Sequence, residues 1–233
     1  MFGPYFQLVR LPAVFSSMSN AFAGFWIGSA VAGVPGAWWA LVAGVSAAAL
    51  FLMGRMAHND IADAAVDADE RPGRPIPSGR VPLPRAWLLV AACFAGGLLL
   101  QLSAAPAAAG VGALLVVAIF LYNFVLKGTV LGPVSMGLCR VLNLAAGMAL
   151  CLPPAAFTSL PPAVFGALAS LWLYVGLVTF LARDEVRGNA PGRVKLFFGL
   201  LAAWYAAWAA YAATSRGLAA VADSPPAYAV VDL

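Results

Sequence analysis

The fold is decided by residues 37–67, which read AWWALVAGVSAAALFLMGRMAHNDIADAAVD. Residues 37–57 form an apolar segment of the length that a helix needs to cross the hydrocarbon core, about 20 residues. The segment is followed by Asp60, Asp63 and Asp67, whose spacing would place three carboxylates on one face of a helix. Like charges at one-turn spacing repel one another unless a cation lies between them. The stretch therefore predicts a membrane helix that ends in a site for a divalent cation.

The composition places the whole chain among polytopic membrane proteins. Of the 233 residues, 63% are hydrophobic and only 9% are charged, and the mean hydropathy is +0.91. No ordinary soluble domain has such a composition. The apolar runs are continuous rather than alternating, which excludes a β-barrel. They give seven predicted spans, at residues 13–34, 37–57, 86–105, 107–126, 130–152, 161–182 and 194–214. We predict an all-α transmembrane bundle that forms a single domain over residues 1–214, followed by a loose tail over residues 215–233.

The positions of the charged residues predict how the bundle is oriented. Nearly all Lys and Arg residues fall in loops on one side of the predicted spans, whereas the loops around 34–37, 105–107 and 152–161 carry no charge. By the positive-inside rule, the N-terminus and the charged loops 58–85 and 183–195 face the cytoplasm, and the C-terminus lies on the far side. The net charge of +4 does not indicate nucleic acid, because the basic residues are not gathered on one soluble face. We predict an integral membrane protein of a bacterial inner membrane.

The two charged loops together predict a site for an anionic substrate. In the first loop the acidic stretch runs directly into arginines, among them Arg71 and Arg74. The second loop carries Asp184 and Glu185, with Arg183 beside them. Carboxylates, a hard cation and phosphate oxygens are mutually suited ligands. If packing brings the loops together over a shared cavity, the sequence predicts a membrane enzyme that acts on a pyrophosphate.

A resemblance to a known family rests on one run of motif residues: Asn59-Asp60-x-x-Asp63-x-x-x-Asp67, then Arg71, Arg74-Pro75 and Ser78-Gly79-Arg80. This run resembles the first aspartate-rich motif of the UbiA-type intramembrane prenyltransferases. Tyr122-Asn123 and Lys127 are similar to that family's Tyr…Lys segment after the fourth span. Residues 136–143 and 179–188 resemble the divergent EboC-like branch more closely. The resemblance covers most of the chain.

The resemblance implies a Mg²⁺-dependent transfer of an isoprenyl group from a prenyl pyrophosphate to an acceptor within the membrane. It implies that the metal is held by Asn59, Asp60, Asp63, Asp67, Asp184 and Glu185. Among these, the residues expected to be catalytic are Asp60, Asp63, Asp67 and Glu185. Arginine offers a bidentate fork to phosphate and lysine a point charge. The pyrophosphate oxygens are therefore expected to contact Arg71, Arg74, Lys127 and Arg183.

Two features depart from the pattern of the family. Its second motif has aspartates four residues apart, whereas Leu181 stands four residues before Glu185 here. A weakened or lost second metal site is therefore expected. The family also has nine spans where this chain has about seven predicted ones. The cavity is then expected to be closed differently, for example by a second copy of the chain in a homo-oligomer.

Polar residues within the spans are candidates for the acceptor site. An arginine near the bilayer centre is expensive, so Arg140 is expected to face a cavity or a partner. Gly137, Asn143 and Gly147 share its helical stripe, and small residues there allow helices to approach closely. The structural alternative for these polar side chains is a hydrogen bond between helices. The residues proposed to line the acceptor cavity are Asn20, Tyr122, Arg140 and Asn143.

A second functional hypothesis stays open beside the transferase. The incomplete second motif and the smaller number of spans also suit a non-catalytic carrier or binding protein for prenyl and other amphipathic molecules on a degenerate scaffold. Mg²⁺-dependent release of pyrophosphate from a prenyl donor would distinguish the two. The sequence specifies neither the chain length of the donor nor the acceptor, because both depend on the shape of the cavity between the helices.

Overall fold

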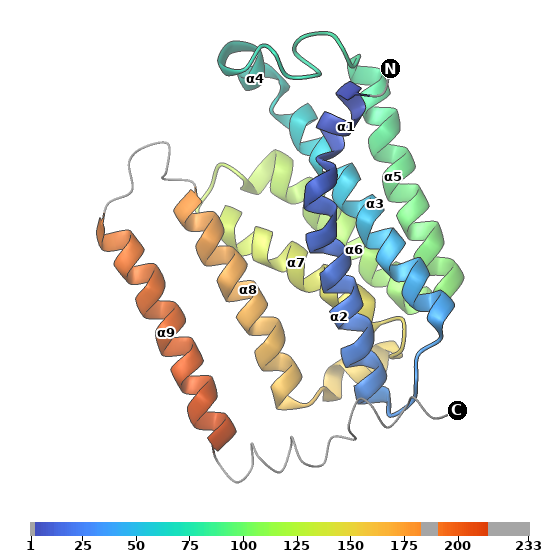
Figure 1. Ribbon diagram of the computed structural model, residues 1–233, viewed down its shortest axis with the longest axis vertical. Helices are drawn as coiled ribbons and strands as arrows, with labels where there is room; N and C mark the ends of the chain where they lie inside the picture. The colour runs from blue at the N-terminus through green and yellow to red at the C-terminus, as the bar shows by residue number, and fades with distance from the viewer. Residues whose placement is uncertain (1–2, 183–190, 214–233) are drawn as a thin grey trace.

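The computed structural model describes residues 3–182 and 191–213, and within them it contains helices and no strands (Figure 1). Seven long helices lie at the positions of the seven predicted spans: α2 (Val14–Ala32), α3 (Trp38–Ala62), α5 (Leu83–Ala104), α6 (Pro106–Leu121), α7 (Gly132–Met148), α8 (Pro162–Ala182) and α9 (Pro191–Ala213). The all-α prediction is confirmed. The predicted tail, residues 215–233, lies outside the described residues.

Short helical elements join the long ones at their ends. They are α1 (Gly3–Val9), η1 (Leu11–Ala13), α4 (Ala64–Glu70), the π-helical η2 (Tyr122–Leu126) and η3 (Pro154–Ser159). Proline begins or follows many of these elements, because it has no N–H to donate and its fixed φ suits the first turn of a helix. α6 and η2 run on from one another, so together they match the predicted span 107–126.

Five of the described helices are long and apolar enough to cross a membrane. They are α3, α5, α6 with η2, α8 and the segment Val194–Tyr211 of α9. α7 is shorter than the hydrocarbon core is thick. Its 17 residues extend about 26 Å, whereas the core measures about 30 Å. Its apolar character is also interrupted by Arg140 and Asn143. The membrane class is confirmed, and the number of spans stays a prediction.

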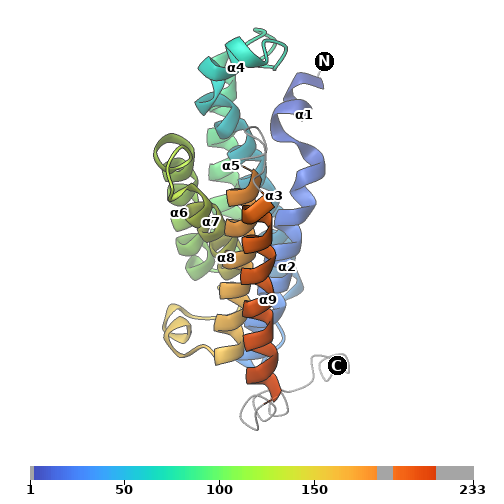
Figure 2. The same cartoon turned by 90° about the vertical axis from the view of Figure 1, so that its left-hand side faces the viewer.

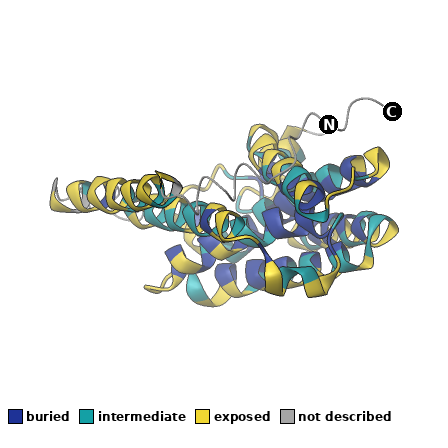
Figure 3. Cartoon of the chain, turned by 90° about the horizontal axis from the view of Figure 1, so that it is seen from below, coloured by how far each residue is buried: buried dark blue, intermediate teal, exposed yellow. Residues whose placement is uncertain are grey.

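The long helices pack around a core that α3 and α5 share with α6. α2 packs against α3 and α7, α8 packs against α7, and α9 packs against α8. Figure 3 shows that burial is concentrated in one part of the molecule. None of the apolar window of α9 is buried, and only 11% of the window of α8 is. The described core therefore belongs to α2, α3, α5, α6 and α7, and α9 lies at its edge (Figure 1).

The charged elements and the apolar connections lie at opposite ends of the bundle. In Figures 1 and 2, α1 and α4 stand at one end of the long axis, and the connections from α2 to α3 and from α7 to α8 stand at the other. This arrangement agrees with the alternation of charge that the sequence shows. The assignment of the charged end to the cytoplasm stays a prediction.

Glycine allows α2 and α7 to touch backbone to backbone. A Cβ atom at Gly24 would lie 2.1 Å from the carbonyl oxygen of Leu144, and one at Gly147 would lie 2.4 Å from that of Ala21. Small residues let membrane helices approach this closely. The predicted close approach is thus confirmed at Gly147 and also at Gly137, which faces α8, where a Cβ atom would lie 2.6 Å from the carbonyl oxygen of Trp172.

The substitution Gly24→Ala is expected to destabilise the bundle by about 1–3 kcal/mol, because α2 and α7 must move apart to admit the methyl group. The measurement is the midpoint of thermal unfolding of the detergent-solubilised protein. Gly110→Ala on α6 is the matched control, since a Cβ atom there meets no atom within 4 Å. Equal midpoints for the two variants would contradict the close approach of α2 and α7.

Candidate active site

The acidic stretch lies at a break between two helices. α3 ends at Ala62. The next residue, Asp63, has φ −90° and ψ 0° and is both the C-cap of α3 and the N-cap of α4. Hydrogen bonds continue through the break, from the Asp63 N–H to the carbonyl of Asn59 and from the Asp67 N–H to the carbonyl of Asp63. The predicted continuous helix is therefore interrupted at Asp63, and the three carboxylates do not share one partner. The carboxylates divide into two groups.

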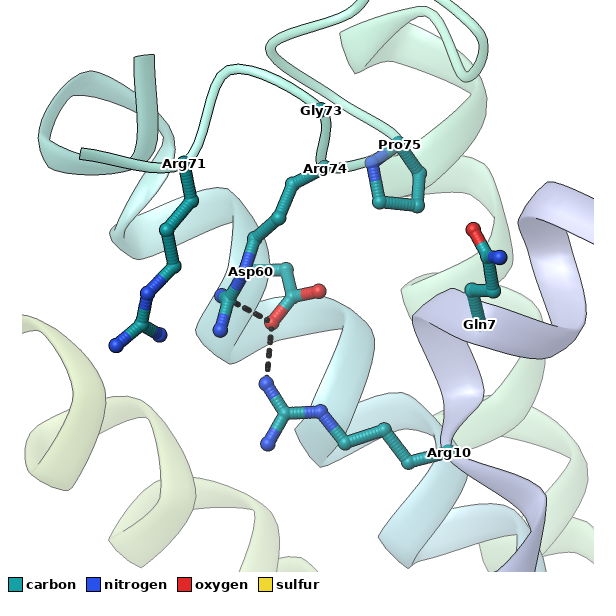
Figure 4. Close-up of a pocket in the computed structure, with 7 residues that line it drawn as sticks. All are labelled: Gln7, Arg10, Asp60, Arg71, Gly73, Arg74 and Pro75. Carbon is teal, nitrogen blue, oxygen red and sulfur yellow. Dashed lines mark hydrogen bonds and ion pairs between the residues drawn. The ribbon is translucent and has the colours of Figure 1, made fainter. Parts of the chain in front are cut away.

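The first group contains Asp60 and Asp67, which share one guanidinium. Nη1 of Arg74 donates to Oδ1 of Asp60 over 3.3 Å and to Oδ2 of Asp67 over 2.7 Å. Arg10 donates through Nη2 to the same Asp60 oxygen over 2.9 Å (Figure 4). Both carboxylate side chains are only 6% exposed, so their charges depend on these partners.

The loop that carries Arg74 is a series of hydrogen-bonded turns. The N–H of Arg74 bonds to the carbonyl of Arg71, and the N–H of Val81 bonds to the carbonyl of Pro75. Gly79 has a φ of +72°, a left-handed conformation that glycine adopts without a steric penalty. Val81 is fully buried and fixes the end of the loop in the core. This geometry explains why the motif continues into prolines and a glycine after its carboxylates.

A cavity of about 490 Å³ opens beside this group (Figure 4). Its lining residues are Gln7, Arg10, Asp60, Arg71, Gly73, Arg74 and Pro75. Three arginines and one carboxylate thus line the cavity, which leaves it with a positive charge. Among the described residues Arg71 forms no ion pair, so its guanidinium is available to a ligand. A cavity of this charge suits a polyanion such as pyrophosphate.

The second group contains Asn59, Asp63 and Lys127. Nζ of Lys127 donates to Oδ1 of Asn59 over 2.9 Å and also to Oδ2 of Asp63. The Asn59 amide donates to the same Asp63 oxygen over 3.0 Å. Lys127 reaches this position at the end of η2, where its N–H bonds to the carbonyl of Tyr122, five residues earlier. Such π-turns occur frequently at functional sites.

A buried histidine holds η2 against α3. His58 is fully buried, and its Nδ1 lies 2.6 Å from Nδ2 of Asn123. Its ring also packs against Phe120, Phe124 and Trp87, with centroid distances of 4.2, 4.8 and 5.6 Å. His58 directly precedes Asn59, so this contact sets the distance between the motif and the segment that carries Lys127.

The oxygen ligands present fit Mg²⁺, although they do not form a closed metal cage. Within the described ranges, no group of three His, Cys, Asp or Glu side chains is arranged to hold a metal ion. Asp60 and Asp67 nevertheless converge on one cationic nitrogen, as Asn59 and Asp63 do on another. Mg²⁺ typically takes one or two carboxylates and completes its coordination with water and substrate phosphates. Each group supplies such a ligand set.

Deeper in the bundle, Arg55, Arg140 and Asn143 line a second cavity of about 20 Å³. Arg140 donates to the carbonyl and hydroxyl oxygens of Ser16 over 3.3 and 3.1 Å, and Asn143 donates to the carbonyl of Ser17 over 2.9 Å. Hydrogen bonds between helices, the structural alternative, are thus present. The same side chains also line a cavity, so the two interpretations coexist.

Of the remaining predicted residues, one contacts a residue that lines this cavity, one lines neither cavity, and three lie outside the described residues. Tyr122 is buried, and its ring centroid lies 5.9 Å from the guanidinium carbon of Arg55. Asn20 is half-buried and is not among the residues that line the described cavities. Arg183, Asp184 and Glu185 lie outside the described residues, as does most of the second charged loop.

Three residues at the site were missed by sequence reasoning. Gln7 and Arg10 line the larger cavity. His58 connects α3 to η2 through its contact with Asn123. Arg10 is the sole basic residue before the first predicted span, which was the available indication. Its approach to Asp60, fifty positions away, depends on how α1 packs on α3.

The fold and the motif can now be compared with known proteins. Residues 18–230 match the model of the UbiA prenyltransferase family. The chain therefore belongs to the UbiA prenyltransferase family, as the acidic motif predicts. It is an integral membrane protein of that family, with apolar helices long enough to span a bilayer.

Curated relatives match over part of the chain. The digeranylgeranylglyceryl phosphate synthase of Methanopyrus kandleri is 39% identical over 105 residues, which are 43% of this chain and 39% of the relative. The synthase of the same name from Sulfurisphaera tokodaii is 31% identical over 123 residues, 53% of this chain and 43% of the relative. In these matches the chain spans about two fifths of the length of its relatives.

Solved structures show the same fold. A UbiA homolog from Archaeoglobus fulgidus bound to DMAPP and Mg²⁺ superimposes with a TM-score of 0.65 at 17% identity, over 97% of this chain and 83% of that one. The apo UbiA homolog from Aeropyrum pernix superimposes with a TM-score of 0.60 at 16% identity, over 89% of this chain and 93% of that one. These relatives are archaeal, so the bacterial inner membrane and the EboC-like branch stay predictions.

Proposed function

We propose that this chain transfers an isoprenyl group from a prenyl pyrophosphate to an acceptor within the membrane, with Mg²⁺ as its cofactor. The observation that carries the proposal is the cavity that Arg10, Arg71 and Arg74 line together with Asp60 at the charged end of an apolar bundle. A polar, cationic cavity suits the pyrophosphate, and the apolar helices below suit the isoprenyl chain. The Archaeoglobus fulgidus homologs bound to DMAPP and to GPP with Mg²⁺ support the same ligand pair.

Two sets of residues would hold the cofactor. Asp60 and Asp67 would hold one ion, since both carboxylates already contact one cationic nitrogen, Nη1 of Arg74. Asn59 and Asp63 would hold a second ion, with Asp184 and Glu185 of the other charged loop as further ligands. Bound Mg²⁺ supplies neutralisation of the charge that develops on the leaving pyrophosphate. Arg71, Arg74, Lys127 and Arg183 would contact the pyrophosphate oxygens and add to this stabilisation.

The transfer breaks one bond and forms another. The bond between the allylic carbon and the pyrophosphate oxygen breaks, and its electron pair stays with the pyrophosphate. The acceptor atom then bonds to the allylic carbon and releases its proton. Residues of the chain hold the leaving group in its cationic cavity, while apolar side chains exclude water, which would otherwise capture the allylic cation.

The acceptor site is proposed around the second cavity, which at about 20 Å³ holds little more than one water molecule and must widen to admit an acceptor. Arg55 and Arg140 line it, and neither forms an ion pair within the described part of the chain. Asn143 lines the same cavity, and the ring centroid of Tyr122 lies 5.9 Å from the guanidinium carbon of Arg55. The curated relatives are named for a product that carries a glyceryl phosphate. A phosphate-bearing lipid acceptor would therefore suit two uncompensated arginines.

Arg140→Ala is expected to lower the rate of acceptor prenylation by about tenfold or more while leaving donor binding unchanged, since one charged hydrogen bond contributes about 1.5–3 kcal/mol. The measurement is the initial rate with geranylgeranyl pyrophosphate and geranylgeranylglyceryl phosphate, beside a donor-binding titration. Asn20→Ala, outside the described cavities, is the comparison variant. Wild-type turnover in Arg140→Ala would contradict an acceptor role.

The test of the proposal is pyrophosphate release by the purified protein from geranylgeranyl pyrophosphate, with Mg²⁺ or with EDTA. Release that needs Mg²⁺ and increases with an acceptor would support the transferase. Tight donor binding without release would favour the carrier hypothesis instead. One observation keeps that hypothesis open: the last turn of α8 carries Leu181 where the family has a carboxylate.

A further inference from the structure

Arg10 has a backbone conformation that points to a specific role. It lies between α1 and η1 with φ 48° and ψ 56°, in the left-handed region. Among the described residues it is the one non-glycine residue with a positive φ. The left-handed region is unfavourable for residues with a Cβ atom, and such conformations persist only where surrounding contacts hold them.

The contacts around Arg10 show what the turn achieves. Leu8 and Val9 are buried, at 0% and 6% exposure, and Leu8 belongs to the core that Ala57 and Ile61 of α3 also form. The left-handed residue interrupts the helix directly after them, between α1 and η1. The guanidinium of Arg10 can then reach Asp60 while the preceding side chains stay in the core. In Figure 4, Arg10 and Gln7 come from a different segment of the chain than Arg71 and Arg74, across the cavity.

Asp60 serves two cations through a single oxygen. Oδ1 accepts from Arg10 over 2.9 Å and from Arg74 over 3.3 Å, and Arg74 has the shorter bond to Asp67, 2.7 Å. Arg74 therefore keeps a partner if Asp60 binds another cation. Arg10 has no second carboxylate among the described residues, and its side chain is 42% exposed beside the cavity. Arg10 is the residue that a metal ion on Asp60 would release.

We infer that Arg10 is an additional pyrophosphate ligand, which pairs with Asp60 until Asp60 binds Mg²⁺ and then binds a pyrophosphate oxygen. The inference rests on the proposed function of the same cavity. It predicts that Arg10 has opposite effects on the two ligands. Arg10 competes with Mg²⁺ for Asp60, because both are cations that would bind the same carboxylate. Arg10 assists pyrophosphate, because its released guanidinium lies in the same cavity as Arg71 and Arg74.

The test uses the full chain in detergent, titrated by calorimetry first with Mg²⁺ alone and then with inorganic pyrophosphate in the presence of Mg²⁺. Arg10→Gln is expected to weaken pyrophosphate binding by about tenfold or more. Its affinity for Mg²⁺ alone is expected to stay equal or to increase. Arg10→Lys keeps the positive charge but loses the forked guanidinium. Its affinity for pyrophosphate is expected to lie between those of the wild-type protein and Arg10→Gln. Arg85→Gln is the matched control, because Arg85 is exposed, belongs to the same charged end and lines neither described cavity.

Each remaining outcome decides against the inference. If Arg10→Gln weakens Mg²⁺ and pyrophosphate binding alike, Arg10 has only a structural role, and the midpoint of thermal unfolding would fall as well. If pyrophosphate binding is unchanged in Arg10→Gln, Arg10 is not a ligand, although the proposed function stands. If the wild-type protein does not bind pyrophosphate with Mg²⁺, the proposed function fails together with the inference.

Discussion

Asp67→Asn is expected to abolish Mg²⁺-dependent binding of a prenyl pyrophosphate, with a loss of affinity of about 100-fold or more, equivalent to about 2.7 kcal/mol. Asp67 is buried at 4% exposure, and its carboxylate receives the shorter bond from Arg74. The amide of asparagine has nearly the same shape but no charge. The variant therefore removes a metal ligand while preserving the packing of α4. The measurement is an equilibrium titration with geranyl, farnesyl and geranylgeranyl pyrophosphates, with Mg²⁺ or with EDTA.

The matched control for this variant is Asp69→Asn. Asp69 lies two residues further along α4, is exposed and forms no ion pair within the described residues. The Asp69→Asn variant is expected to bind the donors with the same affinity as the wild-type protein. An equal loss in both variants would mean that the general negative charge of α4, rather than a ligand set built on Asp67, accounts for the binding.

Lys127→Met is expected to lower kcat/KM for the donor by about 10²–10³, the effect typical of removing one preorganised group from a developing charge. Lys127 contacts Asn59 and Asp63 and lies at the end of the π-turn of η2. Methionine preserves most of the apolar stem, so the substitution removes the ammonium group with little change in packing. The measurement is the initial rate of pyrophosphate release over a range of donor concentrations.

The other lysine of the chain provides the control. Lys195 is exposed on α9, and Lys195→Met is expected to leave the rate unchanged. Lys127→Arg is expected to recover part of the lost activity, because the positive charge is retained although its geometry differs. A wild-type kcat/KM in Lys127→Met would show that Lys127 does not act on the pyrophosphate.

The positions of the long helices could be predicted from the sequence because the physical requirements on a membrane-spanning segment are simple. A segment that crosses the hydrocarbon core must be about 20 residues long and apolar, and it must satisfy its backbone hydrogen bonds internally. The predicted span 37–57 accordingly matches α3, and 161–182 matches α8 within one residue. The prediction failed where the chain leaves that environment. Periodicity predicted one continuous helix through Asp63, whereas α3 ends before Asp63, which pairs with Lys127 while Asp67 pairs with Arg74.

The candidate site could be predicted residue by residue only where a motif is local. Asn59, Asp63 and Lys127 were assigned to one site from the motif and the resemblance, and the structure brings them into contact. Their roles toward metal and pyrophosphate stay predictions. The contacts of Arg10 with Asp60 and of His58 with Asn123 join residues 50 and 65 positions apart. Such contacts depend on tertiary packing, which no local pattern encodes.

The left-handed backbone of Arg10 has a consequence for engineering this protein. A residue with a Cβ atom in that conformation loses about 1–2 kcal/mol relative to its favoured geometry, whereas glycine and asparagine adopt it readily. Gly or Asn at position 10 would therefore relieve this backbone penalty. Those same variants would lack the guanidinium beside Asp60. Thermostabilised versions of the protein are best made with Arg10 held constant, since relief of the backbone at position 10 also removes a partner of the buried Asp60.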